Sequence, residues 1–394
     1  MSQNPHQVFK SVEDYGRWAS YILQCDLIEG LASDEKERAK QALEYLRVVF
    51  GESFLKRAIA QGHPLIGLFR NCAPWTRLKL IGLAESLEAM RGAENFKMIL
   101  KRIKDVPKMG AEGKFTDGYS VLQTAHQFFR VGLQVCFVSE KGSRKKPDIK
   151  LSDKETGEEV YVEVSALHIS AEVKRIQDVN RYVFFLVSGA MAEAQLTIYG
   201  EMPKSFNESH APNLVKQISE VIAEVKASGE LRELIDEYIV AGVAPRRKLE
   251  QLNQWAAERG FSQDLAGPPM IFSEISRVQR KIREKLAQLP NDKPGIIVIP
   301  DLGGFLFHFY DLSLIISELE KQVSGYPNLL AIVLSQGYAD EPLSDIVLEK
   351  SGPHIIINRL VAGCIKEPIA IVRNQAFALN VSQSMLAKIS RAFS

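Results

Sequence analysis

The chain contains few cysteines and no long hydrophobic run. Only four of its 394 residues are cysteine, and none forms a Cys-x-x-Cys pair, which argues against structural zinc and against a disulfide framework. The longest apolar stretch, near residues 182–194, is too short and too mixed to span a bilayer. The first residues lack the basic and apolar parts of a signal peptide, so we expect a cytoplasmic protein that does not bind membranes.

The near-zero net charge and two absent motifs narrow the function further. The net charge of +1 gives no overall attraction for nucleic acid, so such binding must depend on local basic patches. No Gly-x-Ser-x-Gly or His-Glu-x-x-His segment occurs, which argues against hydrolases of those types. The 46% hydrophobic and 25% charged contents are those of a globular protein with an ordinary core.

Two patterns of apolar residues divide the chain. Residues 1–110 have apolar positions at three- and four-residue spacing, which predicts a helical domain. Residues 111–394 alternate short apolar strands with helices, which predicts an α/β domain with a mostly buried sheet, and we expect a helical insertion at about 205–262. The fold class is therefore mixed α/β. The N-terminal helical domain is a candidate surface for self-association or for a protein partner.

Two adjacent predicted strands between residues 144 and 170 each carry an acid. Asp148 opens the first strand, and Glu163 lies among valines in the second, where a carboxylate is costly to bury unless it is paired. Residues two apart on a strand face the same way, so a hairpin would bring Asp148, Lys150, Glu163 and Ser165 into one cluster. Because hard cations prefer oxygen ligands, the two acids predict a Mg²⁺ or Mn²⁺ site. Lys150 would then stabilise charge on a phosphate, and Ser165 would hold a metal-bound water.

Each of these residues also has a structural interpretation. Asp148 follows a proline, as turn residues commonly do, and Glu163 alternates with valines, as on a half-exposed strand that faces solvent. Lys150 and Ser165 are ordinary surface residue types. Two interpretations therefore stay open for these four residues: they form one functional cluster, or they are four positions without a shared role.

The order of elements resembles the PD-(D/E)xK nuclease superfamily, which has the restriction-endonuclease-like fold. Over about residues 115–170 the chain presents a helix, a strand (Gln-Val-Cys-Phe-Val), a basic loop, Pro-Asp and Val-Glu-Val in the family's order. The resemblance implies that Asp148 and Glu163 are the metal ligands of a nuclease acting on DNA. The chain departs from the family at Ser165, where a lysine is usual, and in the preceding helix, where Gln123 could replace a glutamate ligand.

Two basic segments flank the acids. One is a loop and the other a helix predicted at residues 273–289; their basic residues include Arg144, Lys145, Lys146, Arg277, Lys281 and Lys285. The resemblance implies that the helix lies next to the site. Both segments are candidates for contacting nucleic-acid phosphates. The alternative interpretation is that each is only a solvated outer surface of the protein. The two departures leave a second hypothesis open, a nuclease-fold module that has lost catalysis and binds nucleic acid or a protein partner.

Overall fold

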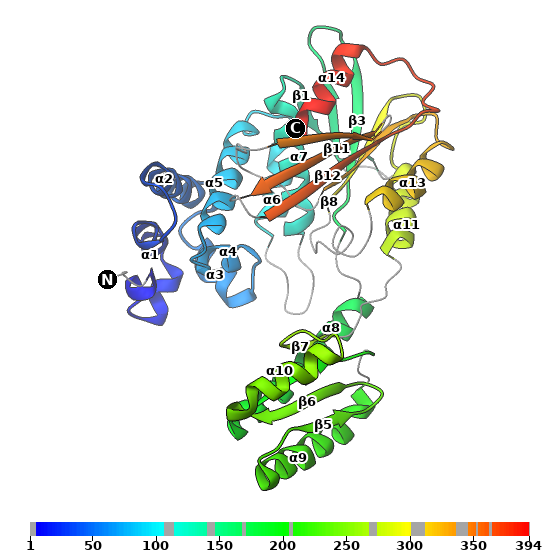
Figure 1. Cartoon of the computed structure of the whole chain (residues 1–394). Coiled ribbons are helices and arrows are strands. Elements are labelled where there is room, and N and C mark those ends of the chain that lie inside the picture. Colours follow the sequence, from blue (N-terminus) through cyan, green and yellow to red (C-terminus); the bar gives the residue numbers. More distant parts are fainter. Residues whose placement is uncertain are drawn as a thin grey trace. The chain divides into compact units, whose positions relative to one another are not determined.

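The chain forms two compact units in a computed structural model (Figure 1). The structure describes residues 5–105, 114–139, 146–167, 171–204, 208–267, 274–300, 312–335, 346–351, 354–361 and 365–393. Unit 1 comprises Met1–His168 and Glu274–Ser394, and unit 2 comprises Ile169–Ser273. Unit 2 is thus an insertion within the sequence of unit 1. Helices and strands occur in both units, which confirms the predicted mixed α/β class.

Unit 1 begins with seven consecutive α-helices among its described residues. They are α1 (Trp18–Gln24), α2 (Ser33–Phe50), α3 (Phe54–Gln61), α4 (Leu65–Arg70), α5 (Pro74–Ala89), α6 (Phe96–Ile103) and α7 (Phe115–Arg130). Helix α2 begins at Ser33 and carries Asp34 and Glu35 in its first turn, at the positive end of the helix dipole. Helix α3 ends at Gly62, whose φ of 68° suits glycine.

An eight-stranded sheet forms the centre of unit 1. Its strands are β1 (Gln134–Phe137), β2 (Ile149–Ser152), β3 (Glu159–Val164), β8 (Gly295–Pro300), β9 (Leu329–Ser335), β10 (Ile346–Ser351), β11 (His354–Val361) and β12 (Ile365–Arg373). The order across the sheet is β1-β2-β3-β8-β9-β12-β11-β10. Strands β3, β8 and β9 run parallel, and the remaining neighbours are antiparallel. Every residue of β8 and β9 is buried, as expected for strands covered on both faces.

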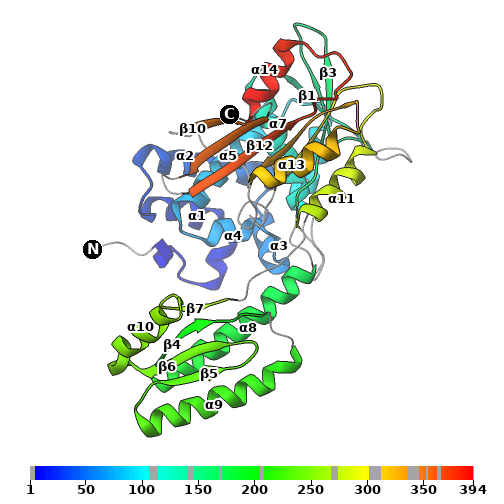
Figure 2. The same cartoon turned by 45° about the vertical axis from the view of Figure 1, so that its right-hand side comes forward.

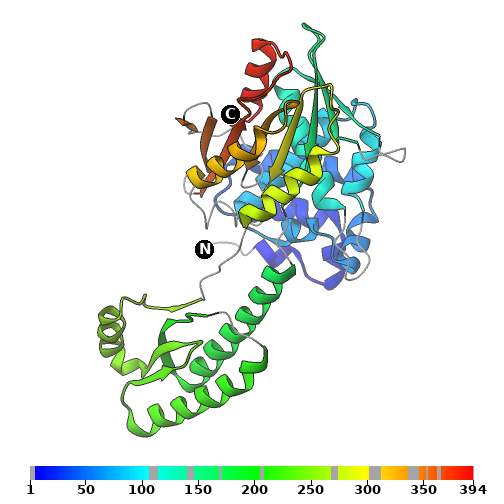
Figure 3. The same cartoon turned by 90° about the vertical axis from the view of Figure 1, so that its right-hand side faces the viewer.

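Helices cover both faces of this sheet (Figures 2 and 3). Val160, Val162 and Val164 of β3 face a core that includes α7 and the C-terminal helix α14 (Gln383–Ala392). Tyr161 faces the opposite core, formed with α11 (Glu274–Leu286) and α13 (Leu312–Val323). The N-terminal helices share the first core with the sheet, so these helices and the sheet belong to one compact unit.

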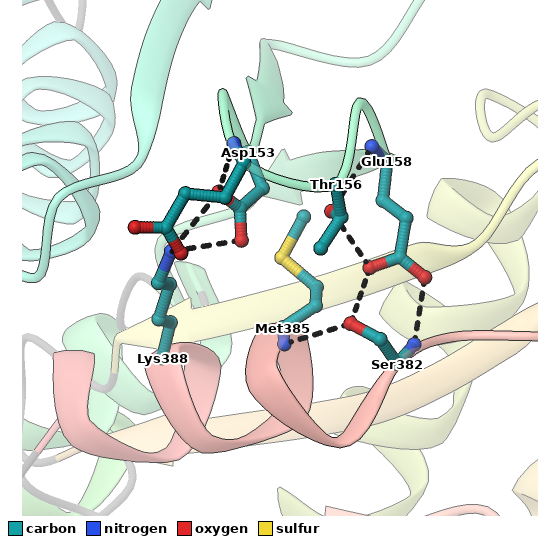
Figure 4. Close-up of polar contacts among 7 residues, drawn as sticks. Asp153, Thr156, Glu158, Ser382, Met385 and Lys388 are labelled. Carbon is teal, nitrogen blue, oxygen red and sulfur yellow. Dashed lines mark hydrogen bonds and ion pairs between the residues drawn. The ribbon is translucent and has the colours of Figure 1, made fainter.

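Helix α14 is held against the turn of the β2–β3 hairpin (Figure 4). Lys388 Nζ lies 2.9 and 2.8 Å from the two carboxylate oxygens of the buried Asp153. The backbone N–H of Ser382 donates to Glu158 Oε1 at 2.7 Å, and the Ser382 hydroxyl donates to Oε2. That hydroxyl also accepts the N–H of Met385 and caps α14. The turn joining the two acidic strands is therefore fixed by polar contacts.

Unit 2 is an α/β unit with its own four-stranded sheet. Its elements are α8 (Ala171–Ala194), β4 (Leu196–Glu201), α9 (Ala211–Ser228), β5 (Arg232–Ile235), β6 (Val240–Pro245), α10 (Leu249–Glu258) and β7 (Leu265–Ala266), with strand order β5-β6-β4-β7. Helices α8 and α9 pack on one face, and α10 packs on the other.

The expectation that the insertion at about 205–262 is helical was wrong, because strands β5 and β6 lie inside it. Strand β6 consists largely of small residues with weak strand preference, so the sequence shows only a break between helices there. A side chain at Gly242 would meet the Trp255 ring at 2.7 Å, which shows that small residues are needed where α10 approaches the sheet. Pairing with β4 and β5 and close packing under α10, rather than local propensity, make this segment a strand.

Candidate functional site

The two acids predicted to act together are neighbours across the β2–β3 hairpin. The strands pair with Ile149 opposite Val162, and continuing this register by one residue places Asp148 opposite Glu163. Asp148 Oδ2 accepts the backbone N–H of Val164 at 3.1 Å, which holds the aspartate side chain at the end of β3. The hairpin is confirmed, and it brings the carboxylates together on the face of the sheet covered by α11 and α13.

Each carboxylate has a cationic partner from a distant helix. Arg102 of α6 places Nη1 3.3 Å from Asp148 Oδ1. Lys285 of α11 places Nζ 2.5 Å from Glu163 Oε1, where the Glu163 side chain is 1% exposed and that of Lys285 is 20% exposed. The sequence prediction gave Lys285 a nucleic-acid role and missed Arg102. No local pattern marks Arg102, but the apolar positions Val278, Ile282 and Leu286 of α11 indicate which side of this helix faces the sheet.

Lys150 and Gln123 have partners outside this cluster, and Ser165 lies two residues beyond Glu163. Lys150 was expected beside the acids, but its Nζ lies 3.1 Å from Glu159 Oε1, a diagonal neighbour across the hairpin and farther from the site. Ser165 is buried beyond the end of β3, and its backbone N–H donates to the Val298 carbonyl at 2.9 Å. Gln123 is buried between helices, where its Oε1 accepts the Ser86 hydroxyl at 3.3 Å. The ammonium group at the acids thus comes from a helix rather than from either strand.

Burial and mutual repulsion control the charge of the two acids. The pKa of Glu163 is raised to about 8, first by burial and then by the Asp148 carboxylate, while Lys285 opposes the shift. Burial also raises the pKa of Asp148, although Arg102 and the Val164 N–H favour its charged form. Two neighbouring carboxylates, one buried and one half-buried, resist being ionised together unless further positive charge is supplied. The pair therefore favours a bound proton near neutral pH.

The atoms present fit a hard divalent cation. Glu163 Oε2 is buried and accepts no hydrogen bond from the described residues, while its other oxygen contacts Lys285; a proton on Glu163 would be shared with the Asp148 carboxylate, which raises the pKa of Glu163. Asp148 adds a second carboxylate from the facing strand. The described ranges contain no group of three or more His, Cys, Asp or Glu side chains placed to hold a metal. Mg²⁺ is commonly bound by one or two carboxylates, with waters and phosphate oxygens completing its coordination, so two acids are sufficient.

The predicted basic residues are placed only in part. Arg144 and Lys145 lie outside the described residues. Lys146 is exposed two positions before Asp148. Arg277, Lys281 and Lys285 recur every four residues along α11, which places them along one side of this helix. The helix expected at 273–289 is confirmed, and its last turn reaches the acids.

Helices in the described part of the chain are all too short or too polar to cross a membrane. Comparisons with protein-family models, with curated proteins and with solved structures returned no match.

Proposed function

We propose that this protein is a Mg²⁺- or Mn²⁺-dependent nuclease that hydrolyses phosphodiester bonds in DNA. One observation carries the proposal: Asp148 and Glu163 meet across a hairpin, an ammonium group contacts Glu163, and the second oxygen of Glu163 accepts no hydrogen bond from the described residues. Two acids that could hold a metal ion, beside a lysine, suit phosphodiester hydrolysis. The metal ion and the lysine would supply the fixed positive charge that the anionic phosphate needs as it reacts.

Each residue has a role that follows from its position. Asp148 and Glu163 would hold the metal, with the Val164 N–H and Arg102 orienting the aspartate. A bound Mg²⁺ or Mn²⁺ would activate water and neutralise charge on the phosphate. Lys285, at 2.5 Å from Glu163, would stabilise negative charge on the phosphate and the attacking oxygen. This role replaces the one predicted for Lys150.

The proposed fold is a restriction-endonuclease-like core. Supporting it are the antiparallel β1-β2-β3 meander, the parallel strand β8 beside β3, and helices on both faces. DNA would reach the acids past Lys146 and along the side of α11 that carries Arg277 and Lys281. Such lysine and arginine contacts to phosphates would weaken as the salt concentration rises.

Cleavage of plasmid and single-stranded DNA with Mg²⁺, Mn²⁺ or EDTA tests the proposal. The wild-type protein should cut only with metal, and Asp148→Asn and Glu163→Gln should be inactive because each removes a metal ligand. Lys285→Met should lose about 10²- to 10³-fold in rate, the usual effect of removing one preorganised charge-stabilising group.

Two matched controls come from the same hairpin. Lys150→Met and Glu159→Gln break the 3.1 Å ion pair at the other end of the strands and should leave the cleavage rate unchanged. If the wild-type protein cuts no nucleic acid with either metal, the proposed activity is wrong. If it cuts and all five variants cut equally well, the site lies elsewhere.

A second candidate, a binding module of the same fold without catalysis, has its own supporting observation. Arg102 and Lys285 already supply each acid with a positive partner inside the protein. In that case Mn²⁺ titration should show no binding in the low-millimolar range, about the weakest range for carboxylate sites. DNA should still bind in EDTA, with an affinity that falls steeply as salt is raised.

A further inference from the structure

A pocket of about 320 Å³ lies beside the two elements that carry the candidate site. It is lined by Lys146, Pro147, Gln288, Leu289, Pro290, Asn291 and Asp292. Pro147 immediately precedes Asp148 in the chain. On the other wall, the backbone N–H of Gln288 donates to the carbonyl of Lys285 at 3.0 Å. The two walls of the pocket therefore begin one position before Asp148 and three positions after Lys285 in the chain.

The wall formed by residues 288–292 is held in place by the sheet and by α11. Leu289 is buried, and its N–H donates to the Leu286 carbonyl at 3.1 Å. Its side chain lies so close to Gly295 of β8 that a Cβ there would be 2.6 Å from Leu289 Cδ1. Asn328 Nδ2 donates to the Pro290 carbonyl at 2.8 Å. The pocket is thus preformed, and a ligand would not have to order this wall on binding.

The lining offers mainly polar groups, which suit the polar edge of a heterocycle. Pro290 is half-buried and adds some apolar surface, whereas Pro147 and Leu289 are buried, and the amides of Gln288 and Asn291 each offer both donors and an acceptor. Asparagine and glutamine amides bind base edges in this way, and a carboxylate such as Asp292 can accept from an exocyclic amino group. Lys146 adds an ammonium group on the wall next to Asp148.

We propose that this pocket binds one unpaired nucleobase of a single-stranded nucleic acid whose neighbouring phosphate lies at Asp148 and Glu163. The proposal rests on the proposed function for the position of that phosphate. It adds a recognition element that the acids and α11 do not provide, since contacts to phosphates fix position while contacts to bases distinguish sequences. Gln288 and Asn291 are the specificity-determining residues of this pocket.

The test compares two labelled single-stranded 12-residue DNA oligonucleotides by fluorescence anisotropy in EDTA. One carries ordinary bases, and the other carries abasic positions throughout, so that both present the same phosphates. The wild-type protein should bind the base-containing strand at least about fivefold more tightly, the lower limit for one good amide–base contact. Gln288→Ala and Asn291→Ala should bring this ratio close to one without changing affinity for the abasic strand.

The matched control is Gln251→Ala, an exposed glutamine of α10 in unit 2, which should keep the wild-type ratio. Equal binding of both strands by the wild-type protein, an unchanged ratio in both pocket variants, or no binding of either strand would each overturn the proposal. Because the assay contains no metal and measures no cleavage, it tests base binding by the pocket separately from nuclease activity. A base-dependent ratio in a protein that cuts nothing would retain the pocket and refute the nuclease.

Discussion

Replacing Glu163 by glutamine should remove a pH dependence of stability that its position creates. In the folded chain the pKa of Glu163 is raised to about 8, mainly by burial, from an ordinary value of 4.5. Between these pH values the folded state keeps a proton that the unfolded state has lost. Stability from this group is therefore fully present below about pH 4.5 and is lost as the pH rises through about 8.

The size of the effect follows from the two pKa values. A difference in pKa corresponds to 1.36 kcal/mol per pH unit, so the change from 4.5 to about 8 corresponds to at most about 5 kcal/mol. Burial raises the pKa of Asp148 as well, so it adds to the loss in the same direction. Glutamine has nearly the same shape, and its oxygen can still accept a hydrogen bond from Lys285. Glu163→Gln should therefore be less dependent on pH than the wild-type protein.

Urea titrations at intervals from pH 5 to pH 9 without metal, followed by tryptophan fluorescence, measure this difference. The free energy of unfolding of the wild-type protein should fall relative to that of the variant by up to about 4 kcal/mol between pH 5 and pH 8. Mn²⁺ added at pH 8 should restore wild-type stability, because a ligand that binds only the folded state stabilises it. Glu29→Gln, at an exposed glutamate of unit 1, is the control. Parallel curves for the wild-type protein and Glu163→Gln would refute the reasoning.

Two further substitutions test packing in the two units. Lys388→Met leaves the buried Asp153 carboxylate without its ion pair, so the urea midpoint of unit 1 should fall. Lys154→Met, at an exposed position of the same hairpin turn, should leave the midpoint unchanged. An unchanged midpoint for Lys388→Met would contradict this account. Gly242→Ala should destabilise unit 2 by about 1–3 kcal/mol because the new methyl group would overlap the Trp255 ring. Gly189→Ala, in an exposed and open helical position, should instead stabilise it by up to about 1 kcal/mol, and thermal unfolding distinguishes the two.

The sequence predicted the elements whose patterns are local. The two acidic strands and the basic helix α11 were placed correctly, because each has a clear period of apolar residues. The insertion was misread where β6 uses small residues that fit under Trp255, a requirement set by a helix beyond the strand's own sequence. Local propensity carries little information at such a position.

The site was predictable only where it depends on one hairpin. Asp148 and Glu163 are 15 positions apart, and strand periodicity alone places them on one face. Lys285 is 122 positions from Glu163, so its contact depends on how α11 packs over the sheet. Arg102 lies on a helix that no motif connects to the acids. Sequence reasoning therefore brought the two carboxylates together but did not predict the contact between Lys285 and Glu163.

The polar contacts of α14 have a consequence for the order of folding. Glu158 and Asp153 find their partners 224 and 235 positions later in the chain, at Ser382 and Lys388. During synthesis the hairpin emerges long before this helix, so the acids of its turn are made before the serine and the lysine that contact them. Contacts this distant in sequence form slowly. We expect the β2–β3 hairpin, and with it the paired acids, to reach its final rigidity only after residues 382–388 have been made.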